Sequence, residues 1–287
     1  MSNVTFIVAT SLELAMDVNA DVTVEAEYGA TVVEGNLFTA AHHQKEGPFN
    51  PAASPAPCNN PSIPVIKMGT VLLSHLDLDS IGGALRVLES DVFAGNESFW
   101  QLAEFVDLHG VHRLGQSDAG PINTRALYAV WAWLQDHRPR PDFKEVQVVT
   151  EFISDAAEAI SAILDGDEDK LAAGDKFREA EDKLNVESFM HSGFGVVVRT
   201  APGFTNHLYV GADGSVGEAV VAYNTKFGSI TVSFADGGEK ASAREIVQEL
   251  WGKEAGGRDG IAGSPRGTRM TSEDLTDAFN AVAVALM

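Results

Sequence analysis

Apolar residues form one almost unbroken run over 65–73, which only Lys67 and a glycine-threonine pair interrupt. Such a run is typical of a strand that is buried on both faces of a parallel sheet. Polar residues arrive abruptly at 74–79, and apolar residues then recur at helical spacing over 80–88. The pattern therefore predicts a buried strand that leads into a helix, with polar side chains where the strand ends.

The rest of the chain changes character near its middle. Alternating and β-branched stretches predict further strands over 4–33, whereas the proline-rich stretch 47–64 is expected to be a loop. Helices are then expected over 99–106, 122–135, 143–164 and 169–184. After them we expect short strands over 195–200, 208–210, 219–223 and 229–234, a helix over 241–251, a glycine-rich segment over 256–263 and a helix from about 272.

These elements predict an α/β protein with two domains. The larger domain, 1–165, is expected to contain a mainly parallel sheet flanked by helices. A helical linker over 166–188 leads to a smaller α/β domain over 189–287. In open α/β sheets, active sites lie at the carboxyl ends of the strands, which directs attention to residues 74–79.

Charge narrows the range of partners. The chain has 287 residues, of which 41 are acidic and 20 are Lys or Arg, so its formal net charge is −21. Apolar residues make up 45% of the chain, which is enough for a core and excludes wholesale disorder. Long duplex nucleic acid is disfavoured, because its binding depends on basic residues that displace counterions. A small phosphorylated substrate stays compatible with the charge where divalent ions hold it.

Cysteine usage and hydropathy bear on location. Cys58 is the single cysteine, so no intramolecular disulfide can form. The first ten residues lack the basic start of a signal peptide, and no apolar stretch approaches the roughly 18 residues of a membrane span. We therefore expect a cytoplasmic protein without a membrane partner. Neither the helices nor the strands show a pattern that indicates an oligomeric state.

His75, Asp77 and Asp79 alternate at the expected end of the buried strand. Alternate residues of an extended segment point the same way, so the three side chains can converge. Imidazole and carboxylate groups together bind Mn, Mg or Zn, and a carboxylate-rich set favours Mn or Mg. The alternative is that the aspartates cap the helix that begins near Ser80, where the helix dipole favours negative charge.

The segment Ser74-His75-Leu76-Asp77-Leu78-Asp79-Ser80-Ile81-Gly82 resembles the first motif of the DHH phosphoesterases, in which a strand ends in His-x-Asp-x-Asp and a glycine follows three residues later. The resemblance implies a hydrolase with two Mn ions, or with Mg or Zn, in its larger domain. Its substrates would be phosphodiester or phosphoanhydride bonds in dinucleotides, short oligonucleotides or similar small molecules. It further implies that His75, Asp77 and Asp79 are metal ligands and that Asp79 takes part in catalysis.

The naming motif of that family, Asp-His-His, has its nearest counterpart in Ala41-His42-His43. This segment precedes the first motif, so the resemblance requires a permuted order and has Ala41 in place of the aspartate. It implies that His42 is a metal ligand and His43 a catalytic group, whereas the alternative is an exposed pair at a loop edge. It also implies that Asp107 is a bridging metal ligand beside the catalytic candidate His109, the alternative being a polar turn after a helix.

A second part of the resemblance lies near the C-terminus. A strand, a helix and Gly256-Gly257-Arg258 followed by Ala262-Gly263 come in the order seen in the family's substrate-binding domain. The family has His where Arg258 stands, although a guanidinium group can hold phosphate by bidentate contacts. The alternative for the glycines is a plain tight turn. The substrate-binding residues that the resemblance implies are Gly256, Gly257, Arg258, Arg266 and His207.

Two other functions stay open. A metallo-β-lactamase-like hydrolase also carries its metal motif after a buried strand, but Asp77 and Ser80 stand where two of its histidine ligands would be. A non-catalytic metal-binding or nucleotide-binding relative is favoured by Ala41, whereas the intact His-x-Asp-x-Asp segment favours an enzyme. Metal content measured together with phosphodiesterase turnover separates these functions.

Overall fold

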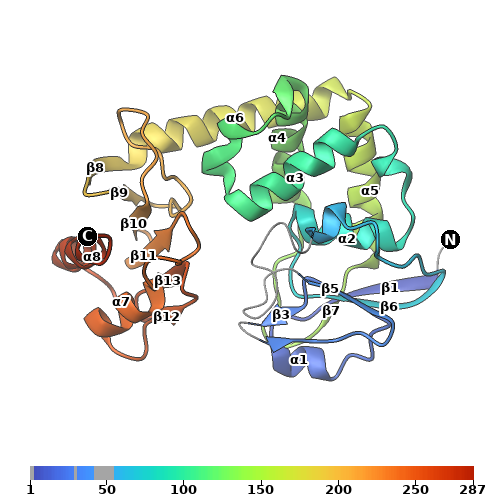
Figure 1. The fold of residues 1–287 in the computed structure, drawn as a ribbon, viewed down its shortest axis with the longest axis horizontal. Coiled ribbons are helices and arrows are strands. Elements are labelled where there is room, and N and C mark those ends of the chain that lie inside the picture. Colours follow the sequence, from blue (N-terminus) through green and yellow to red (C-terminus); the bar gives the residue numbers. More distant parts are fainter. Residues whose placement is uncertain (1–2, 29–30, 42–54) are drawn as a thin grey trace. The chain divides into compact units, whose positions relative to one another are not determined.

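In the computed structural model of the protein, residues 3–28, 31–41 and 55–287 are described, and their contacts divide the chain into two compact units (Figure 1). The first unit comprises Met1–Leu108 and Gln116–Arg178, and the second comprises His109–Gly115 and Glu179–Met287. The boundary at Arg178 falls inside the long helix α6 (Glu168–Ser188). The expected α/β class, with a mainly parallel sheet in the larger part and a strand-rich C-terminal part, is confirmed.

The first unit is built on a sheet with the strand order β5-β2-β6-β1-β7. Its central strand β6 (Met68–Leu73) pairs in parallel with β1 (Asn3–Val8) and with β2 (Val22–Val24), and β2 pairs in parallel with β5 (Phe38–Ala40). Of these five described strands, only the edge strand β7 (Gln147–Val148) runs antiparallel. The carboxyl ends of the other four therefore lie at the same edge of the sheet.

Helices cover both faces of this sheet because its central strands are apolar on both sides. The short helix α1 (Leu12–Met16) lies on one side, and α2 (Leu78–Val87) lies on the other (Figure 1). The other elements of this unit are α3 (Glu97–His109), α4 (Gly120–His137), α5 (Thr150–Leu164), the 3₁₀ turns η1 (Pro57–Asn59) and η2 (Asp91–Phe93), and the hairpin β3 (Glu27–Tyr28)–β4 (Thr31–Val32). The 3₁₀ turn η3 (Val111–Gln116) lies, except for Gln116, in the stretch His109–Gly115 that groups with the second unit.

The second unit contains a six-stranded sheet with the order β12-β13-β11-β10-β9-β8. Among these described strands, only β9 and β10 pair in parallel. The strands are β8 (Phe189–Gly193), β9 (Val196–Ala201), β10 (Ala219–Asn224), β11 (Ser229–Phe234), β12 (Gly256–Gly257) and β13 (Ile261–Gly263). Helices α7 (Ala243–Trp251) and α8 (Ser272–Ala285) bury their apolar sides in the main core of this unit.

Several expected elements differ in the structure. The helix expected over 143–164 begins only at Thr150, because Gln147 and Val148 pair with the end of β1. The strand expected over 208–210 is absent among the described residues, where Val210 makes a single bridge to Val216. Conversely, β8 was not expected, because its largely exposed residues lack an apolar alternation. The proline-rich loop includes the buried 3₁₀ turn η1.

Two glycines of α2 allow η1 to pack directly on the helix. A Cβ atom on Gly82 would lie 2.4 Å from Cβ and 2.9 Å from Cα of Cys58, and one on Gly83 would lie 2.7 Å from Cβ of Pro57. Distances below about 3 Å are steric clashes, and the Cα of Cys58 belongs to the backbone, which cannot swing aside. Gly82 and Gly83 thus determine how closely η1 approaches the polar end of β6.

In the part of the chain that the structure describes, no helix combines the length and the apolar character needed to cross a membrane.

We predict that Gly82→Ala destabilises the first unit. The added methyl group overpacks the contact between α2 and Cys58, and overpacking of this kind costs about 1–3 kcal/mol, more than the higher helix propensity of alanine returns. Urea denaturation of the variant should show a lower midpoint with an unchanged slope. Gly115→Ala is the control, because no atom lies within 4 Å of its Cβ position. Equal midpoints for the two variants would contradict the packing role.

The second unit should be sensitive to acid through His112. Its ring packs 4.4 Å from the ring of Tyr209, and burial, helped by Arg113, lowers its pKa from 6.5 to about 4. Between these two values the unfolded chain binds a proton that the folded chain does not, so the stability present above pH 6.5 is lost as pH falls toward 4. The midpoint of the thermal unfolding of the second unit should therefore fall by a few degrees as the pH falls from 6.5 to about 4.

His112→Gln should flatten that pH dependence, whereas replacement of His137, an exposed histidine at the end of α4, should leave it unchanged. A midpoint that falls equally in all three proteins would show that other groups cause the acid sensitivity.

Candidate functional site

The polar residues that follow β2 and β6 meet at the carboxyl edge of the first sheet. Val24, the last residue of β2, is paired with Leu73, the last residue of β6. Glu25 and Ser74 therefore leave the sheet side by side, and His75, Asp77 and Asp79 continue from Ser74 into α2. The expected metal ligands His75, Asp77 and Asp79 follow this strand end, and Glu25 joins them there.

His75 is hydrogen-bonded through both ring nitrogens. Its Nδ1 lies 2.7 Å from Oγ of Ser74, and its Nε2 lies 2.9 Å from Oδ2 of Asp77. Ser74 donates its own proton to the main-chain carbonyl of Glu25, so its Oγ must accept from His75. With a carboxylate at the other nitrogen, both ring nitrogens face hydrogen-bond acceptors, an arrangement that favours the doubly protonated imidazole.

The pKa of His75 is raised, in agreement with this network. Burial acts to lower it, but the carboxylate of Asp77, followed by those of Asp107 and Asp79, more than offsets burial. The His75 and Asp77 side chains are still 49% and 40% exposed, so the ion pair is open to solvent. An incoming ligand can therefore reach the ring.

Asp77 is the N-cap of α2. It has an extended backbone conformation, and its Oδ1 accepts a hydrogen bond of 2.9 Å from the main-chain N–H of Ser80. Burial would raise the pKa of this carboxyl, but the His75 side chain and the N–H of Ser80 lower it well below its usual value. The capping alternative thus describes part of what Asp77 does.

Asp79 fastens η1 to the site. It is only 3% exposed, and its Oδ1 accepts a hydrogen bond of 2.8 Å from the main-chain N–H of Cys58. Arg86 donates to the carbonyl of Cys58, and Glu104 accepts from the N–H of Ala56. The buried Cys58 thiol has a pKa raised by burial and then by Asp79, which keeps it in the unreactive thiol form.

Glu25 is the functional candidate that sequence reasoning missed. Its side chain is 1% exposed, and its backbone has a positive φ of 51°. Burial and the neighbouring carboxylates, with Asp79 first and then Glu27, Asp107 and Asp77, raise its pKa well above the usual value. In the sequence Glu25 alternates with apolar residues, as a solvent-facing strand residue would. The available signal was its position directly after a short strand.

Asp107 lies in the last turn of α3, whereas the helix predicted from the sequence ends at residue 106, just before it. Its charge raises the pKa values of Glu25, His75 and Cys58, so the fold brings it into the same cluster. His109 ends α3 but groups with the second unit by its contacts. The expected candidates His42 and His43 lie outside the described residues.

In the second unit, the expected substrate-binding residues do not form one group. Gly256 and Gly257 are β12, which pairs with β13, and Arg258 begins the turn between them with an exposed side chain. The N–H of Arg258 donates to the carbonyl of Ile261 at 2.7 Å, as in the tight-turn alternative. His207 pairs with Glu181 of α6 at 2.8 Å. Arg266 lies at a cavity between α7 and α8.

The donors of the first unit suit a hard divalent cation. Glu25, Asp77, Asp79 and Asp107 supply carboxylates, His75 supplies an imidazole, and a cation beside Glu25 would offset the repulsion that raises its pKa. Within residues 3–28, 31–41 and 55–287 no three such side chains already form a metal cage. His75, Asp77 and Asp79 are hydrogen-bonded to protein groups, so ligation requires His75 to give up a proton.

A scan against protein-family models and a search of curated proteins returned no match. The resemblance to the DHH phosphoesterases therefore rests on the motif residues themselves and stays a prediction.

We predict that Glu25→Gln stabilises the metal-free protein. Because the folded state raises the pKa of this carboxyl, wild-type stability falls as pH rises from the unfolded value, near 4.5, through the folded one. Glutamine removes that loss while keeping the size of the side chain. At neutral pH the thermal midpoint in EDTA should rise by about 2–4 °C, the shift that ~1 kcal/mol produces in a unit of this size.

The same substitution should weaken binding of Mn²⁺ by about tenfold or more, measured by calorimetry. Glu34→Gln, at a residue outside the cluster, is the control and should change neither quantity. A lower midpoint for Glu25→Gln in EDTA would show that its neighbours stabilise the Glu25 carboxylate.

Proposed function

We propose that this protein is a metal-dependent phosphoesterase of the DHH type that hydrolyses a phosphodiester or phosphoanhydride bond in a small nucleotide-type substrate. The observation that supports the proposal most is the convergence of Glu25, Asp77, Asp79, Asp107 and His75 at the carboxyl edge of parallel strands. Asp77 caps α2 and Asp79 holds η1, but these structural roles do not by themselves require two further carboxylates, those of Glu25 and Asp107, beside them.

In this proposal the carboxylates and His75 hold two divalent cations, with Mn²⁺ preferred and Mg²⁺ or Zn²⁺ as alternatives. Bound cations of this kind lower the pKa of a coordinated water and neutralise charge on a phosphoryl group. Asp79, buried and fixed by the N–H of Cys58, would be a ligand already held in place by the fold. Asp77 orients His75, whose proton is released when the ring becomes a ligand.

A positively charged side chain near the carboxylates supports an anionic substrate. Arg138, at the C-cap of α4, donates from Nη1 to the carbonyl of Leu76 at 3.3 Å, so its guanidinium lies beside the loop between His75 and Asp77. Its side chain is exposed, and an arginine at such a position can contact phosphate oxygens. It would offset part of the repulsion between the substrate and the carboxylates.

A non-catalytic metal-binding protein is the second candidate. It is favoured by the structural roles of Asp77, which caps α2, and of Asp79, which holds η1, because such roles preserve both residues without catalysis. A cytoplasmic location is part of both proposals, since the single cysteine is a free and buried thiol.

We predict Mn²⁺-dependent hydrolysis of bis-p-nitrophenyl phosphate and of dinucleotides by the metal-stripped full chain. Asp77→Asn and Asp79→Asn should each reduce turnover by at least about 100-fold, because each removes a charged ligand. Asparagine caps helices as well as aspartate does, and its side-chain oxygen can still accept the N–H of Cys58, so the fold should survive both changes.

Asp118→Asn is the matched control, because it removes an exposed carboxylate outside the cluster. Tight Mn²⁺ binding without product would support the non-catalytic candidate. If neither Asp77→Asn nor Asp79→Asn changed metal binding, the cluster would not be a metal site and both proposals would fail.

A further inference from the structure

The second unit contains a cavity of about 440 Å³ that lies within the size range of small-molecule sites. Trp251, the last residue of α7, and Glu254 border it on one side, and Asp274 from the first turn of α8 borders it on the other. The segment from Pro265 to Met270, which connects β13 to α8, closes it. Gly256, Gly257 and Arg258 do not line it, so the cavity is separate from the glycine motif.

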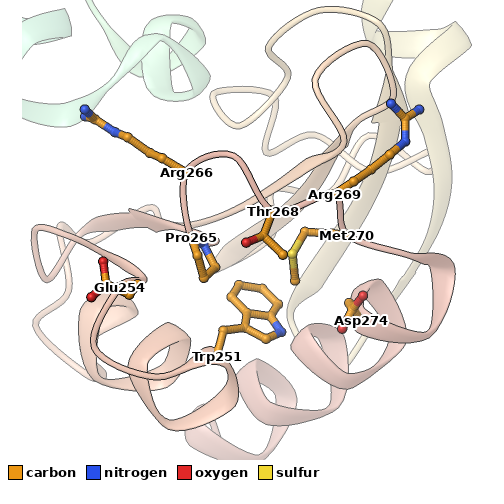
Figure 2. A pocket seen from close by; sticks show the side chains of 8 residues that line it. All are labelled: Trp251, Glu254, Pro265, Arg266, Thr268, Arg269, Met270 and Asp274. Carbon is orange, nitrogen blue, oxygen red and sulfur yellow. The ribbon is translucent and has the colours of Figure 1, made fainter.

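Apolar side chains form one part of the wall of this cavity, and the hydroxyl of Thr268 also borders it. Figure 2 shows the indole of Trp251 at its centre, with the ring of Pro265 and the thioether of Met270 beside it. Met270 is 5% exposed and packs in the main core, which makes this wall rigid. A flat aromatic surface faced by a proline ring and a polarisable sulfur suits a planar ring, which gains both stacking and sulfur contacts.

Charged groups of both signs stand around the apolar interior, and two of them are already engaged. Asp274 accepts hydrogen bonds of 2.7 Å from the N–H and the hydroxyl of Thr271 in a capping box. Arg269 donates to the carbonyl of Thr225 at 3.3 Å. These two residues hold the connecting segment against α8 and against the turn after β10.

The other two charged residues are available to a ligand. In the described part of the chain, neither Glu254 nor Arg266 makes a hydrogen bond or ion pair, and both side chains are exposed. Figure 2 shows the Arg266 guanidinium extended from the rim, away from the indole. The cavity thus combines a surface for a planar ring, a carboxylate that accepts hydrogen bonds, and a guanidinium at a distance from the ring.

We propose that this cavity binds a nucleotide. The base stacks on Trp251 between Pro265 and Met270, the ribose hydroxyls or an exocyclic amine donate to Glu254, and a phosphate accepts from Arg266. An aromatic side chain of a peptide would use the indole but would leave both charged groups without partners, and a free phosphate would use Arg266 alone. The site belongs entirely to the second unit, so it does not depend on the metal chemistry proposed for the first.

Calorimetric titration of the full chain in EDTA tests the proposal, with AMP, adenosine and inorganic phosphate as ligands. AMP should bind, adenosine should bind about tenfold more weakly, and phosphate should show no binding at the same concentrations. Trp251→Ala should weaken AMP binding by about tenfold or more through loss of stacking. Arg266→Gln should reduce the affinity for AMP to that for adenosine.

Lys253→Gln is the charge-matched control, because it removes an exposed positive charge near Trp251 that does not line the cavity. If Trp251→Ala does not fold, the Arg266→Gln comparison, a change on the exposed rim, decides the question by itself. Asp77→Asn should bind AMP like the wild type, which separates this site from the carboxylate cluster. Absence of AMP binding, or equal binding by wild type and Arg266→Gln, would overturn the proposal.

Discussion

The candidate site of the first unit depends on the parallel pairing of β6 with both β1 and β2. Because the last residues of all three strands are in register, the chain leaves the sheet three times at one edge. The described strands β1, β2 and β6 contain no charged side chain, and the charged residues of the cluster follow where β2 and β6 end or come from α3. The close approach of η1 to α2, which Gly82 and Gly83 permit, then closes this edge on one side.

The same residues that stabilise this edge also concentrate negative charge there. Asp77 begins α2, and Asp79 holds the buried turn η1, so each contributes to folding through a hydrogen bond to a main-chain N–H. Their charges act together on Glu25, whose buried carboxyl is the group that the arrangement destabilises. A carboxylate kept under repulsion is a reason to look for a cation, whereas a helix cap is not. The position of Glu25 therefore supports a functional site more strongly than the positions of Asp77 and Asp79, which also have structural roles.

Strand β6, at Met68–Leu73 within the expected 65–73, and the helix after it were predictable, because a continuous apolar run that stops at polar residues fits a buried strand and little else. The terminal helix, expected from about 272, begins at Ser272, where the structure shows a capping box between Thr271 and Asp274. Glu25 was not predictable: its place in the site depends on the pairing of β2 with β6, a contact between residues far apart in the chain.

Other differences have the same physical origin. The late start of α5 follows from the pairing of Val148 with β1, which overrides the local helical pattern. The cavity beside Trp251 is formed by three segments that only the tertiary fold brings together. Local periodicity contains no information about either contact.

The two candidate sites differ in how charge is arranged, and this difference indicates different ligands. The carboxylate cluster of the first unit holds one sign of charge around a buried group, so it gains most from a small cation. In the cavity of the second unit, Glu254 and Arg266 stand apart beside an apolar surface. Such a cavity is best matched by a ligand that combines an aromatic ring, hydrogen-bond donors and an anionic group. In a chain with a net charge of −21, long-range attraction does not collect anions. In the two proposals, recognition of a phosphorylated molecule therefore depends on short-range contacts. These are with bound cations and Arg138 at the first site, and with Arg266 and Trp251 at the second.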